Sequence, residues 1–265
     1  MKNICVVIGM DARFHYLKQA LSSEWDVKMF SSTVWDEKLK NKINHLQPKV
    51  IFLPIQALAV ETLFELPKSC EVLFIGKNND AIEQEIKKMD IHTFYYLEDE
   101  QWIWDNANLT AEGLINYFYT HEKQAIYNKK FIITGYGRVG KRLAYALHHL
   151  GASVIIAVRS EHQLYEAKSY GFQIEALENL LTNQKDNSAY LINTIPFKWL
   201  PKSGALNFNK VYDLASDPGC LLESDEQIPT NYAHALSLPG MYFPRDAGYL
   251  IAQAVQTFLT KVEGE

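Results

Sequence analysis

The sequence has few cysteines and no excess of positive charge. Its 265 residues include three cysteines, Cys5, Cys70 and Cys220, which match neither a disulfide framework nor a zinc site. The formal charge at pH 7 is −5, so the chain lacks the basic footprint of a protein that binds nucleic acid. We therefore expect reduced and mostly buried thiols, no metal and no nucleic-acid partner.

Long apolar runs are also missing. No stretch approaches the roughly 18 uninterrupted apolar residues of a membrane span. The apolar residues 4–8 are soon followed by Asp11 and Arg13, where a signal peptide would continue apolar. We expect no membrane association and a cytoplasmic location.

The sequence does contain a regular alternation of β-rich runs and helical segments, which is typical of parallel sheets with crossover helices. In the first hundred residues it predicts strands at 4–8, 27–30, 50–54, 71–75 and 92–97, and helices at 12–22, 36–45, 57–65 and 79–89. A second series predicts strands at 131–134, 153–158, 190–194, 210–214 and near 232–236, followed by a helix at 245–262.

Between the two series, apolar residues spaced at three and four predict a joining helix. We predict an N-terminal α/β substrate domain at 1–109, a linker helix at 110–128, a dinucleotide-binding Rossmann domain at 129–241 and a C-terminal helix at 242–265. The fold class is then α/β, with two doubly wound parallel-sheet domains across a cleft. We expect the first domain to be flavodoxin-like or Rossmann-like, and the C-terminal helix could pack back against it.

The most informative motif follows the predicted strand at 131–134. It reads Gly135-Tyr136-Gly137-Arg138-Val139-Gly140 and leads into a helical pattern, which is the strand–turn–helix order of a dinucleotide-binding loop. Gly135 permits the tight turn, Gly137 lets the backbone approach a pyrophosphate, and Gly140 lets helix and strand pack closely. Free N–H groups at the helix start then hold the phosphates. We predict a dinucleotide site formed by these six residues.

The end of the next predicted strand bears on the choice of cofactor. An NAD enzyme usually presents Asp or Glu there to the ribose hydroxyls, whereas this chain has Arg159 and Ser160. Arg159 can stack on the adenine or pair with a 2′-phosphate, and Ser160 can donate to the same phosphate. We predict NADP, with NAD as the alternative because Glu161 could reach the ribose. A solvated loop residue is the other interpretation of Arg159.

Further cofactor contacts are predicted where later strands end, because ligands of doubly wound folds bind at the carboxyl ends of strands. Asp217, in the turn after residues 210–214, is either a catalytic carboxylate or only a turn cap. The predicted contacts to cofactor are Asn193, Thr194, Ile195, Asp213, Pro239 and Gly240.

In the first domain, the first predicted strand runs into Gly9, Asp11 and Arg13 at a helix start. A helix N-terminus attracts anions, and a guanidinium forms a fork suited to a carboxylate. We predict that Asp11 and Arg13 bind substrate, with Arg13 facing solvent and holding little of the core. The alternative is an Asp–Arg pair that only fixes the loop.

Together these motifs resemble the A subunits of bacterial dipicolinate synthases, which are spore-associated enzymes. The resemblance covers most of the chain and is best from about residue 90 to 260. In chain order the shared elements are Gly-x-Asp-Ala-Arg at 9–13, Asn-x-x-x-Thr-x-Glu-Gly at 106–113, the glycine-rich loop, the strand end at Arg159 and Ser160, Asn-Thr-Ile-Pro at 193–196, Asp-Leu-Ala-Ser-x-Pro-Gly at 213–219 and Leu-Pro-Gly at 238–240.

The resemblance implies an NAD(P)-dependent oxidoreductase subunit that oxidises a dihydrodipicolinate-type cyclic dicarboxylate to dipicolinate, beside a flavoprotein-like second subunit. We also expect a homo-oligomer. Two ring carboxylates need cationic anchors, for which Arg13 is the first candidate and Arg245 the second. Thr110 and Glu112 would complete the site, and Glu112 or Asp217 would take the proton, since a carboxylate enclosed by apolar groups can have its pKa raised toward neutrality.

The chain departs from the pattern of that family at Cys220, 55–58 and 242–246, so the substrate could differ even where fold and cofactor do not. Residues 217–220 and 238–241 also resemble segments of alanine dehydrogenases, and an amino or imino acid dehydrogenase is therefore the first alternative function. The second is an NADP-binding assembly subunit without chemistry of its own, because no Lys–Asp or His–Glu catalytic pair stands out in the motifs.

Overall fold

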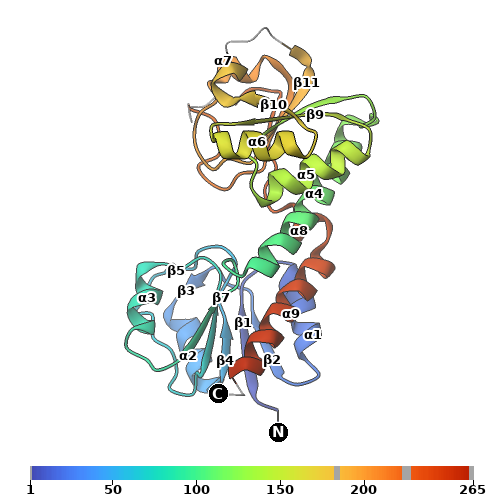
Figure 1. Cartoon of the computed structure of the whole chain (residues 1–265). Helices are drawn as coiled ribbons and strands as arrows, with labels where there is room; N and C mark the ends of the chain where they lie inside the picture. The colour runs from blue at the N-terminus through green and yellow to red at the C-terminus, as the bar shows by residue number, and fades with distance from the viewer. Residues whose placement is uncertain (1, 182–185, 223–227, 263–265) are drawn as a thin grey trace. The chain divides into compact units, whose positions relative to one another are not determined.

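The computed structural model describes residues 2–181, 186–222 and 228–262. The chain divides into two compact units (Figure 1). Unit 1 comprises Met1–Asn106 and Pro239–Glu265, and unit 2 comprises Ala107–Leu238. Each unit is built on one main parallel sheet with helices, which confirms the predicted fold class of two parallel-sheet α/β domains.

Unit 1 has a main sheet of five parallel strands in the order β2-β1-β4-β6-β7. Renumbered along the chain this is 2-1-3-4-5, the order of flavodoxin-like folds. Its inner strands are apolar and buried, as expected of a parallel sheet covered on both faces. The strands are β1 (Ile4–Ile8), β2 (Asp26–Phe30), β4 (Val50–Phe52), β6 (Val72–Ile75) and β7 (His92–Tyr95).

The helices of unit 1 include α1 (Arg13–Leu21), α2 (Glu37–Leu46), α3 (Asp80–Ile86) and the last helix, α9 (Pro244–Val262). Helix α9 lies beside α1 (Figure 1), so the last helix does return to the first domain. A Cβ on Gly248 would lie 2.5 Å from the carbonyl oxygen of Arg13, and the missing side chain therefore lets the two helices approach closely.

The helix predicted at 57–65 is wrong. Part of this segment is strand β5 (Ala59–Val60), which pairs with β3 (Val34–Trp35) in a small parallel sheet. The apolar residues that favour a helix here are Leu58 and Phe64, which are buried in the core cluster that contains Trp35. The ring centroids of Trp35 and Phe64 are 4.6 Å apart. Tertiary packing thus overrides the local pattern.

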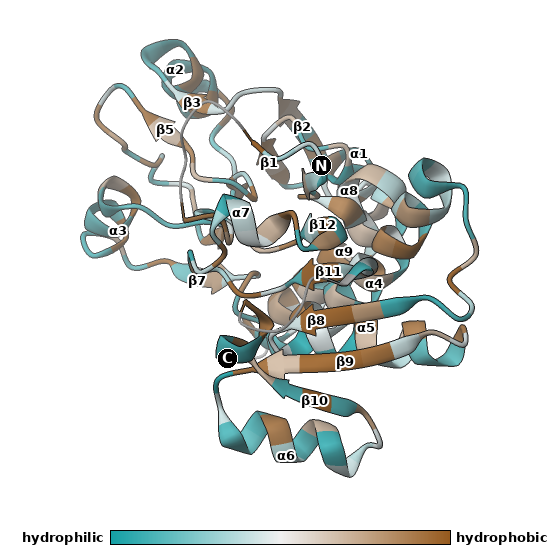
Figure 2. Ribbon diagram, turned by 90° about the horizontal axis from the view of Figure 1, so that it is seen from above, coloured by the Kyte–Doolittle hydropathy of each residue, from teal (hydrophilic) through white to brown (hydrophobic). Residues whose placement is uncertain are grey.

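Unit 2 has six parallel strands in the order β10-β9-β8-β11-β12-β13. Renumbered along the chain this is 3-2-1-4-5-6, the order of the Rossmann dinucleotide-binding fold. Apolar residues run along β8 and β9, while α6 carries mostly polar residues (Figure 2). The strands are β8 (Lys130–Thr134), β9 (Ser153–Val158), β10 (Gln173–Ala176), β11 (Asp186–Asn193), β12 (Phe208–Asp213) and β13 (Tyr232–His234).

The described residues of unit 2 form the helices α5 (Arg138–His149) and α6 (Glu161–Ser169), a 3-10 turn at Leu177–Leu180 and the short α7 (Lys202–Ala205). Two more helices, α4 (Glu100–Glu122) and α8 (Leu238–Tyr242), include residues of both units. Helix α4 starts earlier than the expected linker helix at 110–128, because the Asp99 carboxylate caps it by accepting a hydrogen bond of 2.8 Å from Trp102 N. It ends before Lys123, whose φ of 52° is not helical.

Candidate functional site

The glycine-rich loop joins the carboxyl end of β8 to the start of α5. Gly135 has a φ of +90°, and a Cβ there would lie 2.5 Å from Thr194 Oγ1. A Cβ on Gly140 would lie 2.3 Å from the carbonyl oxygen of Gly135. The first and third glycines are therefore required by the fold itself, since a side chain at either position would collide with neighbouring loop atoms.

Gly137 differs from these two glycines. A Cβ on Gly137 would meet no atom within 4 Å, and its φ of −81° is open to any residue. Gly137 is the N-cap of α5, and no side chain caps this helix. The fold thus leaves open space beside uncapped N–H groups at the positive end of a helix dipole, which fits a pyrophosphate. Arg138 is exposed and Val139 half-buried in the first turn.

Tyr136 can offer only its backbone to such a ligand. Its side chain is buried and lies edge-on to Phe172, with ring centroids 6.3 Å apart. Burial, followed by the charge of Glu166, raises the pKa of the Tyr136 hydroxyl to about 12. Lys141 Nζ lies 5.4 Å from the centre of the Tyr136 ring and pairs with Glu166 at 2.7 Å. The Lys141 side chain on α5 therefore links this helix to Glu166 on α6.

Arg159 and Ser160 follow β9 directly, as predicted, and both are exposed. The Arg159 guanidinium lies over the ring of Phe197, with 5.2 Å from Cζ to the centroid. The Ser160 hydroxyl is the N-cap of α6 and accepts a long hydrogen bond of 3.5 Å from Gln163 N. Its proton remains available to a phosphate. Sequence reasoning missed Phe197, because a lone aromatic after a proline has no recognised pattern.

The predicted contacts Asn193 and Asp213 are fully buried and bonded to the protein. Asn193 Oδ1 accepts hydrogen bonds from Thr134 Oγ1 at 2.7 Å and from Trp199 Nε1 at 3.1 Å. Asn193 Nδ2 donates to Asp213 Oδ1 at 2.7 Å and to the carbonyl of Ile195 at 3.0 Å. This network joins the carboxyl ends of β8, β11 and β12, so these two side chains hold the loops that would flank a cofactor.

Asp213 also organises the loop that follows β12. Its Oδ2 accepts hydrogen bonds from Cys220 N and from the Tyr232 hydroxyl, both at 2.6 Å, and its Oδ1 accepts one from Ala215 N at 3.1 Å. Burial and the bond to Asp213 raise the pKa of Tyr232 above its ordinary value. A Cβ on Gly219 would lie 2.9 Å from Asp213 Oδ2. The loop after β12 is thus folded around the Asp213 carboxylate. Sequence reasoning did not identify Tyr232 as one of the donors to it.

Two further contacts predicted in the 193–196 motif, Thr194 and Ile195, are half-buried and border the glycine-rich loop. Thr194 Oγ1 donates to the carbonyl of Thr134 at 2.8 Å. The ideal Cβ on Gly135 would meet both residues. The structure therefore brings this motif and the glycine-rich loop together at the carboxyl ends of β8 and β11.

In unit 1, Asp11 and Arg13 form a two-pronged ion pair, with Arg13 Nε 2.8 Å from Oδ1 and Nη2 2.7 Å from Oδ2. Arg13 is only 6% exposed, so the expectation of a solvent-facing arginine is wrong. A Cβ on Gly240 would lie 3.1 Å from Arg13 Nε. Gly240, predicted to contact the cofactor, and the buried Pro239 belong to unit 1, where the structure brings Gly240 against the substrate candidate Arg13.

The remaining candidates lie on helices and a loop. Glu112 is exposed and Thr110 half-buried on the unit 2 part of α4, so the apolar enclosure expected for Glu112 is not present within unit 2. Asp217 is exposed in the loop after β12. Arg245 is exposed at the start of α9 in unit 1, with Cζ 5.8 Å from the centre of the Tyr249 ring on the same helix.

Arg13→Ala is expected to lower the free energy of unfolding by about 2–3 kcal/mol at neutral pH, because it removes charge-assisted hydrogen bonds and buried packing. Burial raises the pKa of the Asp11 carboxyl, but the hydrogen bonds and charge of Arg13 outweigh it and hold this pKa below its ordinary value. The pair therefore stabilises the fold above about pH 4 and loses that contribution as pH falls through the lowered pKa. Urea titrations of both proteins at several pH values measure the difference.

The difference between wild type and Arg13→Ala should shrink in acid. Arg245→Ala, an exposed arginine in the same unit, is the matched control and should change stability by less than about 0.5 kcal/mol. Equal, small effects of the two substitutions would contradict a structural role for the Asp11–Arg13 pair.

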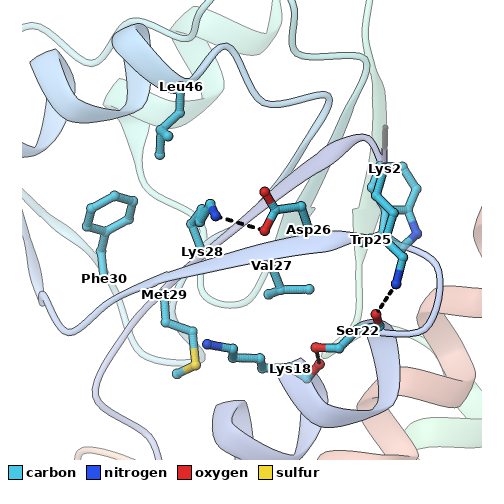
Figure 3. Close-up of a pocket in the computed structure, with 10 residues that line it drawn as sticks. All are labelled: Lys2, Lys18, Ser22, Trp25, Asp26, Val27, Lys28, Met29, Phe30 and Leu46. Carbon is cyan, nitrogen blue, oxygen red and sulfur yellow. Dashed lines mark hydrogen bonds and ion pairs between the residues drawn. The ribbon is translucent and has the colours of Figure 1, made fainter.

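A hollow of about 700 Å³ lies along β2, at one edge of the sheet in unit 1 (Figure 3). None of the predicted site residues lines it. Lys28 pairs with Asp26 at 2.8 Å, and Lys2 Nζ donates to the carbonyl of Ser22 at 2.6 Å. Lysines commonly protect an exposed edge strand from pairing with other chains, which is the role that fits Lys28 on β2.

Metal and membrane features are absent from the described part of the chain. No group of three or more His, Cys, Asp or Glu side chains there is arranged to hold a metal ion. Within the same residues, every helix is too short or too polar to span a bilayer.

Comparison with known proteins also indicates a dinucleotide-binding domain in unit 2. Residues 106–197 match the NAD-binding domain of the D-isomer specific 2-hydroxyacid dehydrogenases. The A subunit of dipicolinate synthase from Bacillus subtilis is 26% identical over 212 residues, which cover 78% of this chain and 71% of that protein. The crystal structure of the dipicolinate synthase A chain from Bacillus subtilis matches this structure with a TM-score of 0.78 and 23% identity. The match covers 100% of this chain and 98% of that chain.

The crystal structure of the corresponding A subunit of dipicolinate synthase from Bacillus halodurans also has a TM-score of 0.78 at 23% identity, with 97% of each chain covered. Unit 2 is an NAD(P)-binding domain of the kind found in oxidoreductases. As its motifs predict, the chain is similar in sequence and fold to the A subunits of dipicolinate synthases.

Proposed function

We propose that the chain is an NADP-dependent oxidoreductase subunit that oxidises a dihydrodipicolinate-type cyclic dicarboxylate to dipicolinate in the cytoplasm. The observation that carries the proposal is the open space at Gly137, beside the uncapped start of α5 in a Rossmann-ordered sheet. The substrate assignment is supported by the similarity to the dipicolinate synthase component over 78% of the chain.

The proposed preference for NADP depends on the end of β9. No carboxylate follows this strand directly, where NAD enzymes usually hold the ribose; Arg159 and the Ser160 hydroxyl lie there instead. No described acidic side chain pairs with Arg159, so its positive charge is available to a 2′-phosphate. The start of α6 adds the positive end of a helix dipole at the same place.

On the substrate, we assign one ring carboxylate to Arg13 and the start of α1, with Arg245 as the weaker second anchor. Arg13 uses Nε and one N–H of Nη2 on Asp11, which leaves further N–H groups of its five for a ligand. Thr110 would bind substrate, and the carboxylate of Glu112 or Asp217 would accept the ring proton. The bound oxidised nicotinamide would take up the hydride, and formation of the aromatic ring favours the reaction.

We also propose that the partner is a second, flavoprotein-like subunit, and that the chain associates with copies of itself. The curated relative is named as one component of a synthase with more than one kind of chain, which supports a multi-component enzyme. A partner explains why no Lys–Asp or His–Glu pair stands out in the motifs of this chain.

The test is an assay of the purified chain with NADP or NAD and a dihydrodipicolinate-type substrate, alone and with the neighbouring subunit. Formation of dipicolinate with NADP, in either preparation, supports the proposal. Oxidation of alanine instead would favour the amino acid dehydrogenase. Binding of NADP without turnover in both preparations would favour the assembly subunit.

A further inference from the structure

The contact between Arg159 and Phe197 spans the mouth of the candidate cofactor site. Arg159 follows β9, and Phe197 lies in the loop after β11, on the other side of β8 in the sheet. Strands two places apart are separated by roughly 10 Å. The arginine side chain therefore reaches across the carboxyl end of β8, where the glycine-rich loop begins.

The ring of Phe197 is 54% exposed, but its loop is fastened to the core. Phe197 N donates to the carbonyl of Ile195 at 2.8 Å. That carbonyl also accepts a hydrogen bond of 3.0 Å from the fully buried Asn193 side chain. The loop is thus tied to the network of Asn193 and Asp213, and Phe197 offers Arg159 a fixed apolar platform.

The contact with Phe197 leaves the N–H groups of Arg159 able to bind an anion. The guanidinium carbon of Arg159 lies 5.2 Å from the centre of the Phe197 ring, within the range of a cation–π contact. A guanidinium that stacks on a ring by its flat face keeps its N–H groups in its own plane, pointing outward. A phosphate binds guanidinium in that plane. The same side chain can therefore remain on Phe197 and bind an anion at its edge, at reduced entropic cost because the guanidinium is already ordered.

We propose that Phe197 is the positioning residue for recognition of the 2′-phosphate: it holds Arg159 at the adenosine end of the cofactor site and thereby sets the preference for NADP over NAD. This inference rests on the proposed function and names the residue that controls its cofactor specificity. Phe197 acts through Arg159 and need not touch the phosphate.

Phe197→Ala tests the inference, with calorimetric titration of 2′,5′-ADP and 5′-AMP, which differ only in the 2′-phosphate. The affinity for 2′,5′-ADP should fall about three- to fivefold, as expected for loss of an exposed cation–π contact, while that for 5′-AMP stays unchanged. Phe197→Tyr keeps an aromatic face and should retain the wild-type preference. Melting temperatures should be unchanged, because the ring is largely exposed.

A double-mutant cycle with Arg159→Ala isolates the coupling. Arg159→Ala should remove most of the preference for 2′,5′-ADP, and adding Phe197→Ala should then have no further effect. Equal losses for both nucleotides in Phe197→Ala would identify an adenine platform instead, and gains for both would identify a latch that blocks the site. An unchanged preference in Phe197→Ala would also overturn the inference.

A failure of the proposed preference for NADP can be distinguished from a failure of the positioning role of Phe197. If the wild-type chain binds 5′-AMP as tightly as 2′,5′-ADP, and NADH as tightly as NADPH, the assignment of NADP is wrong before any variant is measured. If the wild type prefers the 2′-phosphate and only the Phe197 variant fails to change that preference, the positioning role alone is wrong.

Discussion

Gly137→Val should weaken the binding of NADPH at least tenfold, a loss of about 1.4 kcal/mol or more, while the protein stays folded. The branched side chain would fill the space beside the start of α5 that a pyrophosphate needs. The fold leaves room for a side chain at this position, since a Cβ there meets no atom within 4 Å and φ is −81°. Calorimetry measures the affinity, and urea unfolding should show a change below about 1 kcal/mol.

Gly140→Val is the matched control for this prediction. Its Cβ would lie 2.3 Å from the carbonyl oxygen of Gly135, so the substitution should destabilise unit 2 by several kcal/mol, on the order of a severe overpacking change. Gly137→Val thus tests cofactor binding and Gly140→Val tests folding, although both glycines belong to the same motif. Unchanged affinity for NADPH in folded Gly137→Val would refute the dinucleotide assignment.

Asp213→Ala should lower the free energy of unfolding by about 3–5 kcal/mol, because it leaves four donors without their acceptor in a fully buried place. The donors are Asn193 Nδ2, Ala215 N, Cys220 N and the Tyr232 hydroxyl. Two of the bonds, from Cys220 and Tyr232, are 2.6 Å long. The shift of the urea midpoint, followed by fluorescence and circular dichroism, measures the loss.

Asp217→Ala is the control, because that carboxylate is exposed in the same loop and its removal should change stability by less than about 0.5 kcal/mol. Tyr232→Phe removes a single donor and should cost about 1 kcal/mol. A loss for Asp213→Ala no larger than that for Asp217→Ala would contradict the role of Asp213 as the centre of the loop.

Much of the fold is predictable from the sequence, because parallel strands buried on both faces read as short apolar runs. The strands predicted at 4–8 and 153–158 coincide with β1 and β9. By contrast, β10 and α6 were missed. Strand β10 is a half-buried edge strand of sequence Gln-Ile-Glu-Ala, and its polar residues give no continuous apolar signal. The sequence pattern also cannot show that Leu58 and Phe64 join the core cluster around Trp35 from an irregular segment rather than line a helix.

The candidate site is predictable only where glycine geometry carries the signal. The three roles assigned to Gly135, Gly137 and Gly140 correspond to three different local environments in the structure. The burial of Arg13 could not be foreseen, because two residues that lie against it, Gly240 and Gly248, are more than 200 residues away in the chain. Pairing between such distant segments leaves no periodic trace in the sequence.

The return of α9 to unit 1 has a consequence for the order in which the chain assembles on the ribosome. Ile251, Ala252 and Val255 complete the core around Phe14 and Leu17, yet they are synthesised after all of Ala107–Leu238. A nascent chain that has emerged up to Leu238 therefore carries all the described strands of unit 2, while the side of α1 that packs on α9 is still uncovered. Because α9 is made after α1 and after the strands of unit 2, unit 1 completes its core only once α9 has emerged, and until then this apolar surface is open to chaperones.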